Sequence, residues 1–124
     1  MAKKTSAAEL SIEITKLLKE YSTQTTDTVK KIVRRVGRET AKELRQDSPR
    51  DTGEYAAGWR SRVRAEASDK IDVEVYNSSK PQLTHLLEYG HAKVNGGRVE
   101  GIPHIRPAEE EAVKKLESLI KQEV

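Results

Sequence analysis

The sequence predicts an α+β protein, because the spacing of its apolar residues changes twice along the 124 residues. Apolar residues first recur with a helical period, then alternate with polar residues, and finally return to a helical period. We therefore expect a long N-terminal helix, a β-hairpin, a short helix and a C-terminal helix, in that order. No internal repeat and no second domain is evident, so residues 1–124 are expected to form a single domain.

The first predicted element is a long helix within residues 1–46, which begins at Ser6, where Ser6 and Glu9 have the spacing of a capping box. Its apolar stripe comprises Leu10, Ile14, Leu17, Tyr21, Val29, Ile32 and Val36. Residues 22–26 compete for backbone hydrogen bonds, so the helix can bend there. Unbroken, it would be about 60 Å long, which is too long for a chain of this size to cover. We therefore expect part of it to pack on a neighbouring subunit.

The second element is a β-hairpin over residues 54–76, which follows a loop with the sequence SPRDTG at 48–53. On its first strand one face carries Tyr55, Ala57, Trp59, Ser61, Val63 and Ala65, and the other carries Arg60, Arg62, Arg64 and Glu66. We expect Trp59 to be buried against the long helix. The arginines can pair with Asp72 and Glu74 across the hairpin.

The remaining elements are set by prolines and glycines. Pro81 and Gly90 bound a predicted short helix over 81–90. Asn95-Gly96-Gly97 predicts a second hairpin or a long loop within 91–106. Pro107 opens a predicted C-terminal helix over 107–123, with three glutamates in its first turn, where the helix dipole favours anions.

Composition points to a protein that works on a partner. Apolar residues make up 35% and aromatic residues 4% of the chain, which favours a thin core and surface buried on other subunits. The net charge of +3 divides into +6 for residues 1–64 and −3 for residues 65–124. Such a chain can meet an anionic partner or stack on its own copies. There is no cysteine, no signal segment and no membrane span, so a soluble protein of a reducing cytoplasm is expected.

Two sets of residues could carry chemistry. His85, Glu88, His91 and His104 could hold zinc or iron if the loop folded back, but no compact zinc motif is present, and a surface pair and a packed histidine explain them better. No nucleophile elbow or phosphate loop is recognisable, so we expect no enzyme and no cofactor. The basic residues of 30–64 could instead bind DNA without sequence preference, although acids interleave with them and stacking aromatics are missing.

Several segments, taken in order, resemble a known family. They are the SPxxTG loop at Ser48–Gly53, Val75-Tyr76-Asn77, LLEYGHA from Leu86 to Ala92, and IPHIRPAEEEA from Ile102 to Ala112. Together they resemble the gene-ten-like family of small tailed-bacteriophage proteins, known as minor tail, tail-completion or head–tail joining proteins. The resemblance covers nearly the whole chain, but the Asn95-Gly96-Gly97 tip and its flanks depart from it and are not assigned to the shared pattern.

The resemblance implies helices packed on a small curved antiparallel sheet, and a ring of six subunits at the end of the tail. The expected partners are copies of itself, the tail tube and the neck or connector proteins, with no membrane. The expected location is the virion, at the head–tail junction or tail end, after assembly in the host cytoplasm. No catalytic residue carries over. The matching positions are expected to be architectural: Ser48, Pro49, Thr52, Gly53, Trp59, Glu88, Tyr89, Gly90, Pro103 and Pro107.

The resemblance also gives the arginine face of 60–64 two alternatives. Arg60, Arg62 and Arg64 face either the acidic surface of a neighbouring subunit or the lumen of a ring through which genomic DNA passes. The lumen of such a ring should not bind DNA tightly, so acidic residues between the arginines are compatible with that position. We interpret this face first as an assembly surface.

Overall fold

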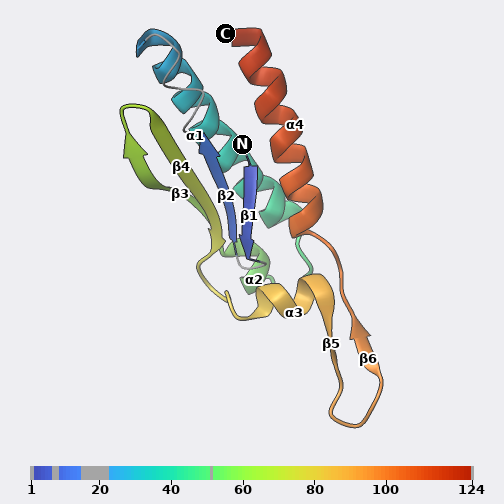
Figure 1. Ribbon diagram of the computed structural model, residues 1–124. Coiled ribbons are helices and arrows are strands. Elements are labelled where there is room, and N and C mark those ends of the chain that lie inside the picture. The colour runs from blue at the N-terminus through green and yellow to red at the C-terminus, as the bar shows by residue number, and fades with distance from the viewer. Residues whose placement is uncertain (1, 7–8, 15–22, 51, 124) are drawn as a thin grey trace.

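A computed structural model describes residues 2–6, 9–14, 23–50 and 52–123. Strands β1 (Ala2–Ser6), β2 (Glu9–Ile14), β3 (Trp59–Ala67) and β4 (Lys70–Asn77) form one antiparallel sheet in the order β1-β2-β4-β3. Helices α1 (Thr23–Asp47) and α4 (Ile105–Glu123) lie side by side on one face of this sheet (Figure 1). The protein is therefore α+β, with long helices packed against antiparallel strands.

The expectation of a helix over residues 1–46 is wrong for its N-terminal part, where β1 and β2 lie. Leu10, Ile12 and Ile14 alternate with polar residues, and their Cα positions pair with those of Val75, Val73 and Ile71 of β4. A stripe of Leu10, Ile14 and Leu17 also fits a helix, so the two periods compete there, and strand pairing decides. Ser6, the expected cap, ends β1.

Helix α1 is correspondingly shorter than the sequence suggested. Its 25 residues span about 38 Å, which the sheet and α4 can cover. The length of α1 therefore gives no reason to expect that this helix packs on a neighbouring subunit. Of the expected bend at 22–26, residues 23–26 lie within α1 and residue 22 lies outside the described residues.

The core lies between α1, α4 and the sheet in two clusters. The first joins α1 to the middle of α4 and to β4, and comprises Val29, Ile32, Val33, Val36, Ile71, Val73, Ala112 and Leu116. The second surrounds the indole of Trp59 and comprises Ala41, Leu44, Tyr55, Trp59, Val75, Ile105 and Ala108. Both clusters draw on α1, β4 and α4, because each of these elements presents an apolar stripe along its whole length.

The expected hairpin over 54–76 starts later, because residues 54–57 form a short helix, α2 (Glu54–Ala57). Tyr55 and Ala57 therefore do not belong to the strand. A β-bulge between Val63 and Ala65 then turns Glu66 away from the arginine face and toward α1, where its carboxylate pairs with Lys30 and Arg34. The strict alternation expected from the sequence fails at this bulge.

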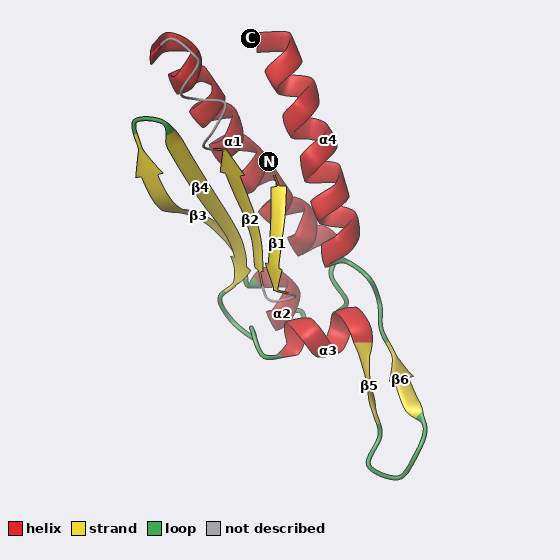
Figure 2. Ribbon diagram, viewed as in Figure 1, coloured by secondary structure: helices red, strands yellow, loops and turns green. Residues whose placement is uncertain are grey.

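The last part of the chain forms a short helix and a projecting hairpin (Figure 2). Helix α3 (Leu83–Tyr89) leads into β5 (Gly90–Ala92), which pairs with β6 (Arg98–Glu100) around the Asn95-Gly96-Gly97 tip. The chain then enters α4 at Ile105, two residues before Pro107. Among the described residues, no helix is long and apolar enough to cross a membrane.

Candidate functional site

The SPRDTG loop fixes the start of the sheet to the end of α1. Ser48 is buried, and its hydroxyl accepts a hydrogen bond of 2.8 Å from the indole nitrogen of Trp59. Pro49 is half-buried beside it, Thr52 Oγ1 accepts a hydrogen bond from the amide of Glu54, and Gly53 has φ 91°. The tryptophan is fully buried in the second core cluster, as the sequence predicted.

A second buried network joins α3 to the start of α4. The carboxylate of Glu88 accepts three hydrogen bonds, from the backbone amides of His104, Ile105 and Arg106, at 2.7, 2.8 and 3.1 Å. These amides have no partner within the helix, so Glu88 caps α4 from a different element. Burial alone would raise the pKa of Glu88, but the three amide donors and nearby His104 hold it below its ordinary value.

His104 completes this network. Its Nδ1 lies 2.8 Å from the carbonyl oxygen of Ile102 and 3.0 Å from Glu88 Oε1, and its Nε2 lies 2.7 Å from the hydroxyl of Tyr55. The carbonyl can only accept, so Nδ1 carries a hydrogen, and in the neutral ring Nε2 accepts from Tyr55. Burial raises the pKa of Tyr55 to about 12, which keeps that donor protonated.

The four residues considered as metal ligands are not arranged as a site. His104 and Glu88 are committed to the buried network, whereas His85 and His91 are exposed. The ring of His85 lies 4.9 Å from that of Tyr89, between centroids. Within the described part of the chain, no three histidine or acidic groups are placed to hold a metal ion.

The arginine face is paired within the subunit, as the sequence suggested. Arg62 bonds to Glu74 at 2.8 Å, and Arg64 bonds to Asp72 at 3.0 Å and to Glu74 at 3.4 Å. Asp72 and Glu74 are buried beneath these two guanidinium groups. Arg60 instead donates to the backbone carbonyls of Ala57 and Trp59. The positive charge of Arg62 and Arg64 is therefore largely balanced before any partner arrives.

The apolar surface gathers instead on α3 and the hairpin after it. Six large apolar side chains are exposed among the residues whose burial is described, and five of them lie between residues 86 and 102: Leu86, Tyr89, Val94, Val99 and Ile102. Every residue from 91 to 100 is exposed. We name residues 90–101 the arm, because this hairpin projects away from α1, α4 and the sheet (Figure 1).

Two glycines close the base of the arm. Gly90 has φ 79°, and a Cβ there would lie 2.2 Å from the carbonyl oxygen of Val99. A Cβ on Gly101 would lie 2.4 Å from the carbonyl oxygen of Glu88. Only glycine lets the two strands approach this closely, and at Gly90 only glycine adopts the backbone conformation without strain. The consecutive residues Glu88, Tyr89 and Gly90 are thus a helix cap, an exposed aromatic residue and the first residue of the arm.

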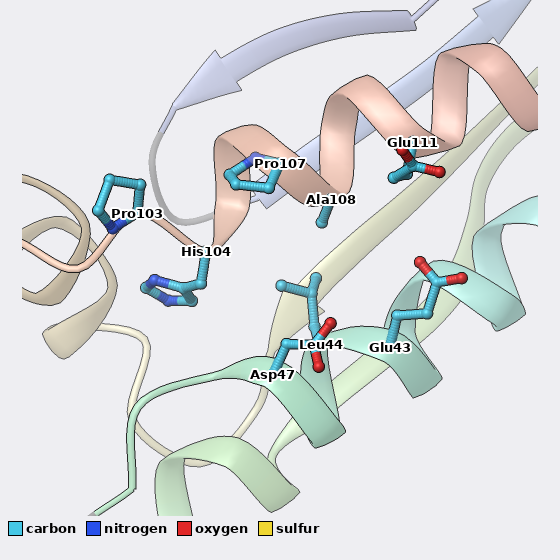
Figure 3. A pocket seen from close by; sticks show the side chains of 8 residues that line it. All are labelled: Glu43, Leu44, Asp47, Pro103, His104, Pro107, Ala108 and Glu111. Atoms are coloured by element: carbon cyan, nitrogen blue, oxygen red, sulfur yellow. The ribbon is translucent and has the colours of Figure 1, made fainter.

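A groove lies where α1 ends and α4 begins (Figure 3). Leu44 and Ala108 point toward each other between the helices, and the exposed rings of Pro103 and Pro107 form one rim. The groove has a volume of about 130 Å³ and is also lined by His104 and by three carboxylates, those of Glu43, Asp47 and Glu111. The sequence analysis named the two prolines as motif positions but did not predict the groove, because the groove forms only where α1 and α4 are in contact.

Sequence reasoning also missed two other positions. Asn77 is buried, donates to the carbonyl of Tyr55 at 2.7 Å and accepts from the amides of Ser79 and Lys80. The motif Val75-Tyr76-Asn77 was the only signal for it. Val94, at the tip of the arm, is fully exposed. Nothing in the sequence distinguishes an exposed valine from a buried one in a short apolar alternation.

Comparison with known proteins identifies the family. A family model described as "Bacteriophage HK97-gp10, putative tail-component" matches residues 12–90, nearly two thirds of the chain. The matched region runs from β2 to the root of the arm, and it includes the SPRDTG loop, Trp59 and Glu88. No curated protein and no solved structure matches the chain. The chain therefore belongs to the HK97 gp10-like family of bacteriophage tail components, whose role is structural and not enzymatic.

Proposed function

We propose that this tail component completes the tail and joins it to the head, as a ring of subunits at the tail–neck interface. The observation that carries the proposal is the arm, an exposed hairpin that presents Val94 and Val99 to solvent. Contiguous exposed apolar surface marks contact sites for partners. The proposed partners are copies of itself, the tail tube and the neck proteins, and membership of a family of tail components supports a partner among the tail proteins.

The placement of charge supports an assembly role over DNA binding. Arg62 and Arg64 already neutralise two buried acids, and Lys30 and Arg34 pair with Glu66. Paired cations release few counterions on a phosphate backbone, so tight non-specific binding is not favoured. In a ring, these residues make at most passing contact with genomic DNA, and the protein resides in the virion after assembly in the host cytoplasm.

The first test is the mass of the native particle by light scattering, across a concentration series and again with purified tail tubes. A discrete multiple of the 13.9 kDa chain, six above all, is the expected result. Electron microscopy of labelled virions should then place the protein at the head-proximal end of the tail. Label confined to the tail shaft, or missing from virions, would rule out the proposed role.

The DNA-binding alternative makes a different prediction. It requires duplex binding that weakens steeply with salt and is lost when Arg60, Arg62 and Arg64 are all replaced by alanine. We expect weak binding that this triple replacement barely changes.

A further inference from the structure

We propose that the tip of the arm of one subunit docks into the groove between α1 and α4 of the next subunit, with Val94 as the apolar anchor. The inference rests on the proposed ring and names the contact that would build it. It is carried by three observations: an unpartnered apolar side chain at the tip, a groove of matching size, and opposite charges around the two.

The tip presents one apolar side chain between two cations. Val94 is fully exposed, and Lys93 and Arg98 flank the turn. Neither cation forms an ion pair with any described residue, although Arg98 donates to the carbonyl of Tyr89. The segment 93–98 carries no acidic residue. Removing such a valine from water is favourable, so a partner surface of matching shape would hold it.

The groove offers that shape. Its volume of about 130 Å³ is close to the cavity of about 150 Å³ that holds one benzene molecule in an engineered protein. The groove therefore has room for one aliphatic side chain outside the buried Leu44 and Ala108, and the exposed rings of Pro103 and Pro107 add apolar surface along one rim.

The charges around the groove complement those of the tip. Three carboxylates line it, those of Glu43, Asp47 and Glu111. Lys115 pairs with Glu43 at 2.8 Å, whereas Asp47 and Glu111 are exposed and pair with no described cation. Lys93 and Arg98 would meet these two acids when Val94 enters. Complementary charge of this kind fixes register and partner choice more than it adds affinity.

The arm does not reach the groove of its own subunit. Pro103, on the rim, lies three residues after β6 ends, and β6 is paired with β5 along the arm, so the tip points away from the groove (Figure 1). Arm and groove are also different surfaces of one chain. A contact between them is head-to-tail, and head-to-tail contacts close into rings when the rotation allows.

Disulfide trapping tests the contact, because the chain contains no cysteine. One preparation carries Val94→Cys and a differently tagged one carries Asp47→Cys, so that only an intersubunit bond joins the tags. The matched control replaces Asp47→Cys with Ser68→Cys, in the exposed β3–β4 turn. We expect roughly tenfold or more cross-linked product over the control, in the free protein or on tail ends, since docking raises the effective concentration.

Charge reversal tests the same contact without cysteine. Lys93→Glu with Arg98→Glu should abolish assembly, as should Asp47→Lys with Glu111→Lys, and mixing the two variants should restore assembly through arms and grooves of reversed sign. If rings form but the Val94–Asp47 pair cross-links no better than the control, another surface builds the ring and this inference is wrong. If no ring forms in solution or on tails, the proposed function itself fails.

Discussion

At the residue scale, a few buried polar side chains connect elements that are distant in sequence. Ser48 ties the loop after α1 to Trp59, Asn77 ties the end of β4 to Tyr55, and Glu88 ties α3 to α4. Each hydrogen bond replaces one to water, so its net value is modest, but losing a single partner leaves a buried group unpaired. These hydrogen bonds lead us to propose that Ser48, Trp59 and Glu88 of the shared motif act in the architecture of the fold.

The Ser48–Trp59 hydrogen bond gives the first prediction. Ser48→Ala should lower the free energy of unfolding by about 1–3 kcal/mol, because the buried indole N–H loses its acceptor. Urea unfolding followed by circular dichroism measures this. In a Trp59→Phe background the same change should cost clearly less, because the donor is gone. Equal losses of unfolding free energy in both backgrounds would show that Ser48 does not stabilise the fold through its hydrogen bond to Trp59.

The Glu88 cap gives a prediction that depends on pH. Its pKa in the folded protein lies below the ordinary value of 4.5, so its ionised form stabilises the fold above about pH 4.5 and this contribution is lost as the pH falls through the lower folded-state value. Glu88→Gln should cost roughly 2–3 kcal/mol at pH 7, since a charged acceptor of three amides is lost.

The pH profile of that variant distinguishes the cap from simple packing. The difference in unfolding free energy between wild type and Glu88→Gln should shrink as the pH falls below 4.5. The control is Glu110→Gln, on the exposed face of α4. A constant difference from pH 7 to pH 3 would contradict the capping role.

At the element scale, the sequence predicts what repeats clearly and fails where two periods compete. A proline or glycine marks the start or end of the last helix, of the short helix before Gly90 and of the Asn-Gly-Gly turn. The structure places each of these elements within a few residues of its predicted position. Residues 9–14 fit a helix and a strand alike, and only pairing with β4 settles them as β2. The bulge at Val63–Ala65 and the groove between α1 and α4 have no local signal at all.

The β3–β4 hairpin gives the element-scale prediction. Arg64→Ala should lower the urea midpoint more than Arg60→Ala, because Arg64 covers the buried Asp72 and Glu74 whereas Arg60 bonds only to nearby carbonyls. The side chain of Arg64 is 39% exposed, so after allowance for solvent screening the expected cost is about 1 kcal/mol. Equal shifts of the urea midpoint for the two variants would mean that pairing with Arg64 does not stabilise the buried Asp72 and Glu74.

At the scale of the whole molecule, the core and the arm occupy different regions. The two core clusters lie between α1, α4 and the sheet, whereas residues 91–100 are exposed throughout. Four basic residues of the first half of the chain, Lys30, Arg34, Arg62 and Arg64, pair inside the subunit with Glu66, Asp72 and Glu74. The charges of Lys93, Arg98, Asp47 and Glu111, on the arm and the groove, are among those available for a neighbour.

The sharing of α1, β4 and α4 by both core clusters leads us to propose that residues 1–124 unfold as one domain. Leu116→Ala, in the first cluster, should cost about 2–5 kcal/mol and shift the urea midpoint. Trp59, the single tryptophan, lies in the second cluster. Its fluorescence should therefore report the same shift as circular dichroism at a fixed protein concentration, while Glu117→Ala, an exposed control on α4, should shift neither signal. A tryptophan midpoint that stays in place while the dichroism midpoint falls would divide the chain into two independently folding units.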